Sequence, residues 1–163
     1  MRAARFIFMG VLILAGVASG RAQMSDAEHI KQWLQGYDAA FVAKDLDKLA
    51  TFYHPEVTIF EGGGVNRGWV DYRDHHLGPE LKESQNLQFS HSNVVVRMLG
   101  RDAAYVTADY AIKGRMGERD VDGGGLATLV LIRDGSGWKI RHSHTSSRRR
   151  APASGDAGRP PGI

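Results

Sequence analysis

The stretch from Trp138 to Ser147 reads Trp-Lys-Ile-Arg-His-Ser-His-Thr-Ser-Ser. In a β-strand successive side chains point to opposite faces, so Trp138, Ile140, His142 and His144 share one face. The first two are large and apolar and place that face in the core. The alternation therefore predicts two imidazoles on the buried face, unless a bulge shifts the register. A structural pair of histidines would give the same pattern.

Upstream of this strand, the hydrophobic pattern predicts helices first and strands afterwards. Helical spacing covers residues 26–43, 45–53 and 69–83, and Pro79 should kink or split the third of these helices. Alternation predicts a short strand at residues 57–61 and four longer strands at 85–99, 103–115, 126–133 and 138–147. This order predicts an α+β domain in which N-terminal helices pack on one face of a strongly curved antiparallel sheet. Such a cone has an open mouth and can hold a small ligand.

The two ends of the chain have compositions that differ from the domain between them. Residues 1–22 carry Arg2 and Arg5, then an apolar run and small residues, as in a signal peptide cleaved after Ala22 or Gly20. An uncleaved membrane anchor is the alternative. Residues 148–163 are rich in Pro, Gly and Ala and predict a disordered tail. We therefore expect a domain at residues 23–147 that is periplasmic or secreted, with no stable membrane insertion after cleavage.

The positive net charge comes from the two ends. The chain has 21 Lys and Arg against 18 Asp and Glu, but residues 23–147 hold 14 of the former and 17 of the latter. A domain near −3 gives no reason to expect nucleic-acid binding. The chain has no cysteine, which excludes disulfides and thiolate chemistry.

Glu61 and Tyr37 are the strongest candidates for chemistry outside the last strand. Glu61 shares a strand face with Val57 and Ile59 and is expected to point inward, where an apolar environment raises a carboxyl pKa and suits a general base. The alternative is an edge glutamate that reaches solvent. Tyr37 lies on the buried stripe of the first helix, where a core tyrosine is the alternative.

Other polar residues are candidates for lining the cavity. His91 shares a face with Phe89, and Tyr53 ends the inner stripe of the short helix. Asp109 and Tyr110 lie on opposite faces of one strand, and alternation alone leaves open which face is inside. His75 on the third helix is a further candidate for ligand binding. His76 and Glu80 lie four residues apart, a spacing most often found on a helix surface.

A metal site is a weaker possibility. His142, His144 and Glu61, with His75 or His91, contain the ligand types of a two-histidine, one-carboxylate set. No helical His-Glu-x-x-His pattern accompanies them. We therefore expect neither a metal nor another cofactor.

Three segments resemble the NTF2-like superfamily, in its SnoaL-like and ketosteroid-isomerase-like branch. They are Gly-Tyr-Asp-Ala-Ala-Phe-Val-Ala-Lys-Asp-Leu-Asp-Lys-Leu-Ala-Thr-Phe-Tyr at residues 36–53, Val-Thr-Ile-Phe-Glu at 57–61 and Gly-Trp-Lys-Ile-Arg-His-Ser-His at 137–144. The resemblance covers about residues 26–147 and implies a cone-shaped fold. It also implies Tyr37 as the hydrogen-bond donor to an oxyanion and Glu61 as the general base.

The resemblance fails at one catalytic position. Ketosteroid isomerases carry a second, protonated acid on a later strand, where this chain has Leu126-Ala127-Thr128. Steroid isomerisation itself is therefore not expected. The resemblance implies a cofactor-free isomerase or lyase/dehydratase acting on a small organic molecule. A non-catalytic ligand-binding module or an oligomeric scaffold of the same fold is the alternative. Homodimers formed through the outer sheet face are common in such folds.

Overall fold

The structure is a computed structural model that describes residues 24–147. The predictions of a signal peptide at residues 1–22 and a disordered tail at residues 148–163 lie outside the described residues. Within them the helical segments are α1 (Asp26–Val42), α2 (Leu46–Ala50), α3 (Trp69–Tyr72), a π-helical turn (Arg73–Leu77) and α4 (Gly78–Glu83). The strands are β1 (Tyr53–Glu61), β2 (Gly64–Arg67), β3 (Ser84–Met98), β4 (Ala103–Met116), β5 (Arg119–Asp134) and β6 (Gly137–Ser147). No helix among these residues is long and apolar enough to cross a membrane.

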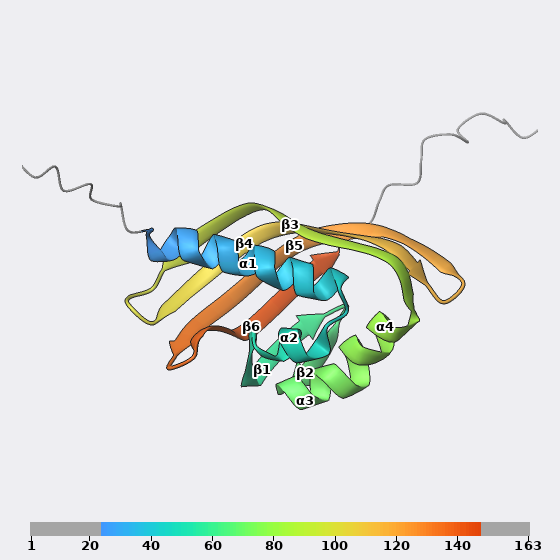
Figure 1. The fold of residues 1–163 in the computed structure, drawn as a ribbon, viewed down its shortest axis with the longest axis horizontal. Coiled ribbons are helices and arrows are strands. Elements are labelled where there is room, and N and C mark those ends of the chain that lie inside the picture. Colours follow the sequence, from blue (N-terminus) through green and yellow to red (C-terminus); the bar gives the residue numbers. More distant parts are fainter. Residues whose placement is uncertain (1–23, 148–163) are drawn as a thin grey trace, which may run out of the picture.

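Helix α1 begins at a side-chain cap and lies across one face of the sheet (Figure 1). The Ser25 hydroxyl accepts a hydrogen bond from the Glu28 N–H at 3.3 Å and so satisfies one of the free amides of the first turn. Its apolar stripe, including Ile30 and Leu34, is buried against the sheet. The α+β class predicted from the order of elements is confirmed.

The six strands form one mixed sheet in the order β2-β1-β6-β5-β4-β3. Strands β3 to β6 are an antiparallel meander, as predicted, whereas β1 pairs with β6 in parallel. Strand β1 begins at Tyr53, four residues before the predicted start. A two-residue turn of Gly62 and Gly63, both with positive φ, leads into β2, which the sequence did not predict.

Strand β5 continues through three glycines that were predicted to precede it. Residues 119–122 extend it beyond the predicted 126–133, so that the β4–β5 hairpin projects past α4 (Figure 1). A Cβ on Gly125 would lie 1.7 Å from the Ser146 carbonyl oxygen, and one on Gly124 would lie 2.4 Å from that of Tyr110. The backbones therefore approach too closely for a side chain, and glycine allows the sheet to curve there.

The inner face of the sheet is buried under the helices and the outer face is open. Trp138 and Ile140 are 8% and 1% exposed, as predicted from the alternation of β6. On the outer face, apolar side chains remain in contact with solvent, among them Phe60, Val65, Val95 and Leu126 at 39%, 50%, 40% and 50% exposure.

Candidate functional site

The carboxyl group of Glu61 lies on the inner face at the end of β1. Val57 and Ile59, four and two residues earlier, are fully or almost fully buried on that face. Burial raises the pKa of the Glu61 carboxyl; nearby His76 lowers it, and Glu80 raises it further. The side chain still keeps 38% of its surface exposed. It is therefore a partly desolvated acid within reach of solvent.

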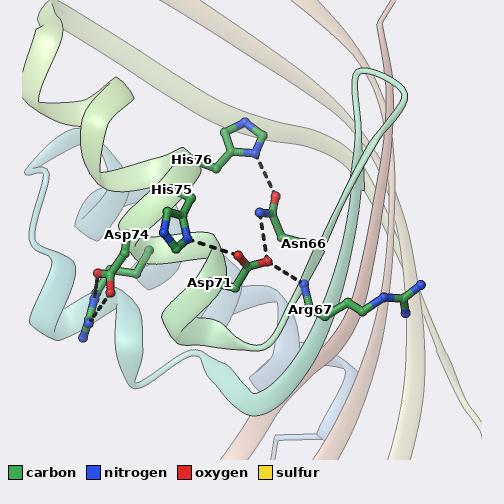
Figure 2. Close-up of polar contacts among 7 residues, drawn as sticks. Asn66, Arg67, Asp71, Asp74, His75 and His76 are labelled. Atoms are coloured by element: carbon green, nitrogen blue, oxygen red, sulfur yellow. Dashed lines mark hydrogen bonds and ion pairs between the residues drawn. The ribbon is translucent and has the colours of Figure 1, made fainter.

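The histidine nearest to Glu61 is His76, not one of those on the last strand. Its Nε2 atom lies 3.9 Å from Glu61 Oε2 and 3.4 Å from Glu80 Oε1. Its Nδ1 atom lies 2.9 Å from the Asn66 Oδ1 atom on β2 (Figure 2). The imidazole side chain is 24% exposed. A histidine that the spacing assigned to the helix surface is thus held between two carboxylates.

The hydrogen bonds of Asn66 determine the tautomer of His76. The Asn66 amide nitrogen donates to Asp71 Oδ2 at 3.2 Å, so the amide oxygen faces the imidazole (Figure 2). The Nδ1 atom must then carry the proton that Asn66 accepts, and Nε2 points at the carboxylates. Asp71 also accepts from the Arg67 backbone N–H at 2.9 Å, and these bonds lower the pKa of its carboxyl. Asn66 and Asp71 were not predicted from the sequence.

The π-helical turn determines which of two adjacent histidines faces the site. Pro79 cannot donate a backbone hydrogen bond, and its ring clashes with the carbonyl four residues earlier in a regular helix. The chain widens instead, and the Gly78 N–H bonds to the Arg73 carbonyl five residues back. A Cβ on Gly78 would lie 2.5 Å from that carbonyl oxygen. His76 consequently turns inward, while His75 is 75% exposed and lies 3.1 Å from Asp71.

Three buried tyrosines extend inward from this acid/base pair. The hydroxyls of Tyr37 on α1 and Tyr53 on β1 are 2.7 Å apart. The rings of Tyr53 and Tyr72 are 5.7 Å apart, and those of Tyr72 and His76 are 5.2 Å apart. Burial raises the pKa of all three phenols well above the ordinary value. They therefore stay neutral and can donate hydrogen bonds. Tyr37 and Tyr53 were predicted as site residues, whereas Tyr72 was not.

His91 is buried at the other end of this row of aromatic rings. Its Nδ1 atom lies 2.6 Å from Asp38 Oδ1, and its backbone N–H donates to Asp38 Oδ2 at 2.9 Å. The side chain is 5% exposed, and its ring lies 6.0 Å from that of Tyr37. The inward orientation considered for His91 is thus observed. Its Nδ1 atom is occupied by Asp38, a partner that was not foreseen.

The prediction that His142 and His144 point into the cone is wrong. Leu131 pairs with Ile140, but Val130 pairs with His142, so Arg141 is an extra residue that reverses the alternation. Ser143 is buried on the inner face, and the two histidines lie on the outer face with Phe60. Neither histidine can therefore be the partner of Glu61.

The bulge occurs beside an irregular part of β1. The parallel register with β6 shifts between Tyr53 and Thr58, a segment that contains Pro55, which has no N–H for the ladder. There the Arg141 guanidinium donates to the Glu56 carbonyl and contacts its carboxylate at 3.2 Å.

Asp109 also lies outside the cone. It is on the outer face of β4 and accepts a hydrogen bond from Asn93 at 2.6 Å, whereas Tyr110 takes the inner face and lies near Phe89. The two-histidine, one-carboxylate set considered for a metal does not form, because Glu61 and the histidines of β6 are on opposite faces. Within residues 24–147 no group of three or more His, Asp or Glu is placed to hold a metal ion.

Comparisons with known proteins agree with this fold. A SnoaL-like domain family matches residues 30–149, most of the chain. No curated protein matches it significantly. A candidate ketosteroid isomerase from Shewanella frigidimarina is similar at 28% identity and a TM-score of 0.59, over 71% of this chain and 92% of that one.

Two further solved structures share the fold at lower identity. A candidate dehydratase of the NTF2-like family from Streptomyces avermitilis is 23% identical, with a TM-score of 0.67 over 77% of this chain and 97% of that one. A candidate calcium/calmodulin-dependent protein kinase II association domain from Xanthomonas campestris is 17% identical, with a TM-score of 0.65 over 76% and 88%. The family match and the shared architecture show that this chain belongs to the SnoaL-like family and has the NTF2-like fold.

Proposed function

We propose that this protein is a cofactor-independent acid/base enzyme, of isomerase or lyase/dehydratase type, that acts on a small organic molecule. The observation that carries the proposal is the convergence of Glu61 and His76 beside three neutral phenols. The fold is shared with candidate isomerases and dehydratases, which is consistent with this chemistry. We further propose that the protein acts after export and as a homodimer.

In the proposed reaction Glu61 removes a proton from a carbon next to a carbonyl group. Its raised pKa makes it a stronger base than an exposed carboxylate. His76 receives that proton at Nε2 or returns it to another atom of the substrate. Returning it to carbon gives an isomerisation, and returning it to a departing hydroxyl gives an elimination of water.

The phenols are suited to stabilise the enolate that forms. Tyr37 and Tyr53 share one hydrogen bond between their hydroxyls. The two hydroxyls carry two protons. One proton is donated within the pair, and the other can be donated to the substrate oxygen. A buried donor that needs no rearrangement stabilises developing charge more than water does.

The proposal can be tested without knowing the substrate. The probes are a panel of cyclic β,γ-unsaturated ketones and β-hydroxyketones in D₂O, and NMR follows the exchange of their α-protons for deuterium. Wild-type protein should accelerate exchange for at least one class. Glu61→Gln should lower the accelerated rate by about 10²–10⁴-fold, the usual contribution of a positioned base. Tyr37→Phe should lower it by about 10²–10³-fold.

Glu118→Gln is the matched control, because this glutamate is exposed on the β4–β5 hairpin, away from the site. It should leave the rate unchanged. Exchange no faster than in buffer for the whole panel would instead favour a non-catalytic binding module. A Glu61→Gln protein as active as the wild type would remove Glu61 from the mechanism.

A further inference from the structure

The outer face of the sheet carries two imidazoles side by side where β6 meets β1. His142 and His144 are two residues apart on β6, after the bulge, and pair with Thr58 and Phe60 of β1. Both rings contact the Phe60 ring, at centroid distances of 4.9 and 6.1 Å. The chemistry proposed for the inner face uses neither histidine.

The spacing of the two histidines suits the binding of one metal ion by both. Alternate residues of a strand lie about 6.6 Å apart and project from the same face. Two imidazoles standing at that distance can lean toward one ion placed about 2.0–2.1 Å from each nitrogen. Neutral imidazole is a good ligand for Zn²⁺, Cu²⁺ and Ni²⁺.

One of the two rings is held in place by a hydrogen bond. The Nδ1 atom of His142 lies 2.7 Å from the Thr58 hydroxyl oxygen. If Nδ1–H donates to that oxygen, Nε2 keeps its lone pair for an ion, as in metal sites whose histidines donate their other N–H to a fixed partner. His144 is exposed, and within residues 24–147 only its ring contact with Phe60 is observed.

Two histidines are half of a tetrahedral zinc site. Within residues 24–147 no third His, Asp or Glu joins them. The surface around them includes the exposed apolar side chains Phe60 at 39%, Val65 at 50% and Leu126 at 50%, beside the polar Thr58 and Thr128. A second copy of the same surface supplies the two missing ligands and covers the apolar side chains, because a two-fold axis beside the histidines repeats the pair.

We propose that His142 and His144 bind a divalent transition-metal ion, and that the same two histidines of a second copy of this chain complete a four-imidazole site across the outer face. The ion then links two copies. The site is separate from the acid/base residues, which lie on the other side of the sheet.

The test uses the purified protein without a histidine tag, at pH 7.5, with Zn²⁺ as the probe. Calorimetry should find one ion bound for every two chains. Sedimentation should show that Zn²⁺ at 100 times its dissociation constant lowers the dimer dissociation constant about 100-fold, and that EDTA reverses the change. Co²⁺ in place of Zn²⁺ should give the visible absorption of a tetrahedral complex.

Variants distinguish Zn²⁺ binding at this site from non-specific Zn²⁺ binding elsewhere on the protein. His142→Gln and His144→Gln should each abolish the effect of Zn²⁺ on the dimer. Thr58→Val should weaken Zn²⁺ binding about 10–100-fold, because it releases the His142 ring. His29→Gln, which alters an exposed histidine on α1, is the matched control and should bind as the wild type does. Circular dichroism in EDTA checks that every variant is folded.

Two results would overturn the proposal. The first is Zn²⁺ binding of wild-type strength in the double variant His142→Gln/His144→Gln. The second is one ion per chain with no change in the dimer dissociation constant, which would show that the ion is not shared.

Discussion

At the scale of single residues, the burial of Glu61 has a cost to stability that depends on pH. Burial raises the pKa of its carboxyl in the folded protein, Glu80 adds to this, and His76 and Tyr72 oppose it. The folded state therefore holds the proton more tightly than the unfolded chain does. The stabilisation from this group is complete below the unfolded pKa of about 4.3 and is lost as the pH rises through the folded-state pKa.

The Glu61→Gln substitution should consequently stabilise the protein more, relative to the wild type, as the pH rises. The amide cannot ionise and avoids the penalty, so the free energy of unfolding of the variant relative to the wild type should be larger at pH 7 than at pH 4. Urea denaturation at the two pH values measures this difference. Glu118→Gln, at an exposed position of the β4–β5 hairpin, should show almost no such pH dependence. The opposite trend for Glu61→Gln would mean that its attraction to His76 outweighs its desolvation.

At the scale of elements, local backbone irregularities set the directions of the candidate site side chains. The π-helical turn before Pro79 brings His76 to Glu61, and the bulge at Arg141 takes His142 and His144 away from it. The glycines of β5 curve the sheet that surrounds the site. Each feature changes the direction of side chains that a regular helix or strand would have placed elsewhere.

Gly125→Ala and Gly123→Ala test the role of the curvature in a matched pair. A Cβ on Gly125 would lie 1.7 Å from the Ser146 carbonyl oxygen, whereas the nearest atom to one on Gly123 is a methyl group of Ile112 at 3.8 Å. We expect Gly125→Ala to lower the free energy of unfolding by about 1–3 kcal/mol or more, as overpacking does. Gly123→Ala should change it by less than about 0.5 kcal/mol. Equal effects in urea denaturation would show that the close approach of β5 to β6 is not needed.

At the scale of the whole molecule, the two faces of the sheet differ in what they carry. The inner face holds the tyrosines and the acid/base pair under the helices. The outer face exposes apolar side chains beside two histidines.

Leu126→Asp should prevent the proposed homodimer. Leu126 is 50% exposed in the middle of the outer face, and a carboxylate there would be buried without a partner in the dimer. Light scattering in EDTA should give a dimer mass for the wild type and a monomer mass for the variant. Val70→Asp, at a 60% exposed residue of α3, should remain dimeric. A monomer mass for the wild type at every concentration would show that this face does not assemble without metal.

The sequence alone determined the order of the elements other than β2, the α+β class and the core face of most strands. It did so because these features depend on local periodicity: the alternation of β6 places Trp138 and Ile140 in the core, and that of β1 places Glu61 inward. Pro79 also marked correctly where the third helix is interrupted.

Only the tertiary structure decided which polar residues meet. His142 bonds to Thr58, 84 residues earlier, and His91 to Asp38, 53 residues earlier. One extra residue in β6 reversed the direction of two histidines, and one widened helical turn exchanged the roles of His75 and His76. A bulge depends on the neighbouring strand, here an irregular segment of β1 that contains Pro55, and so it leaves no periodic signal of its own in the bulged strand.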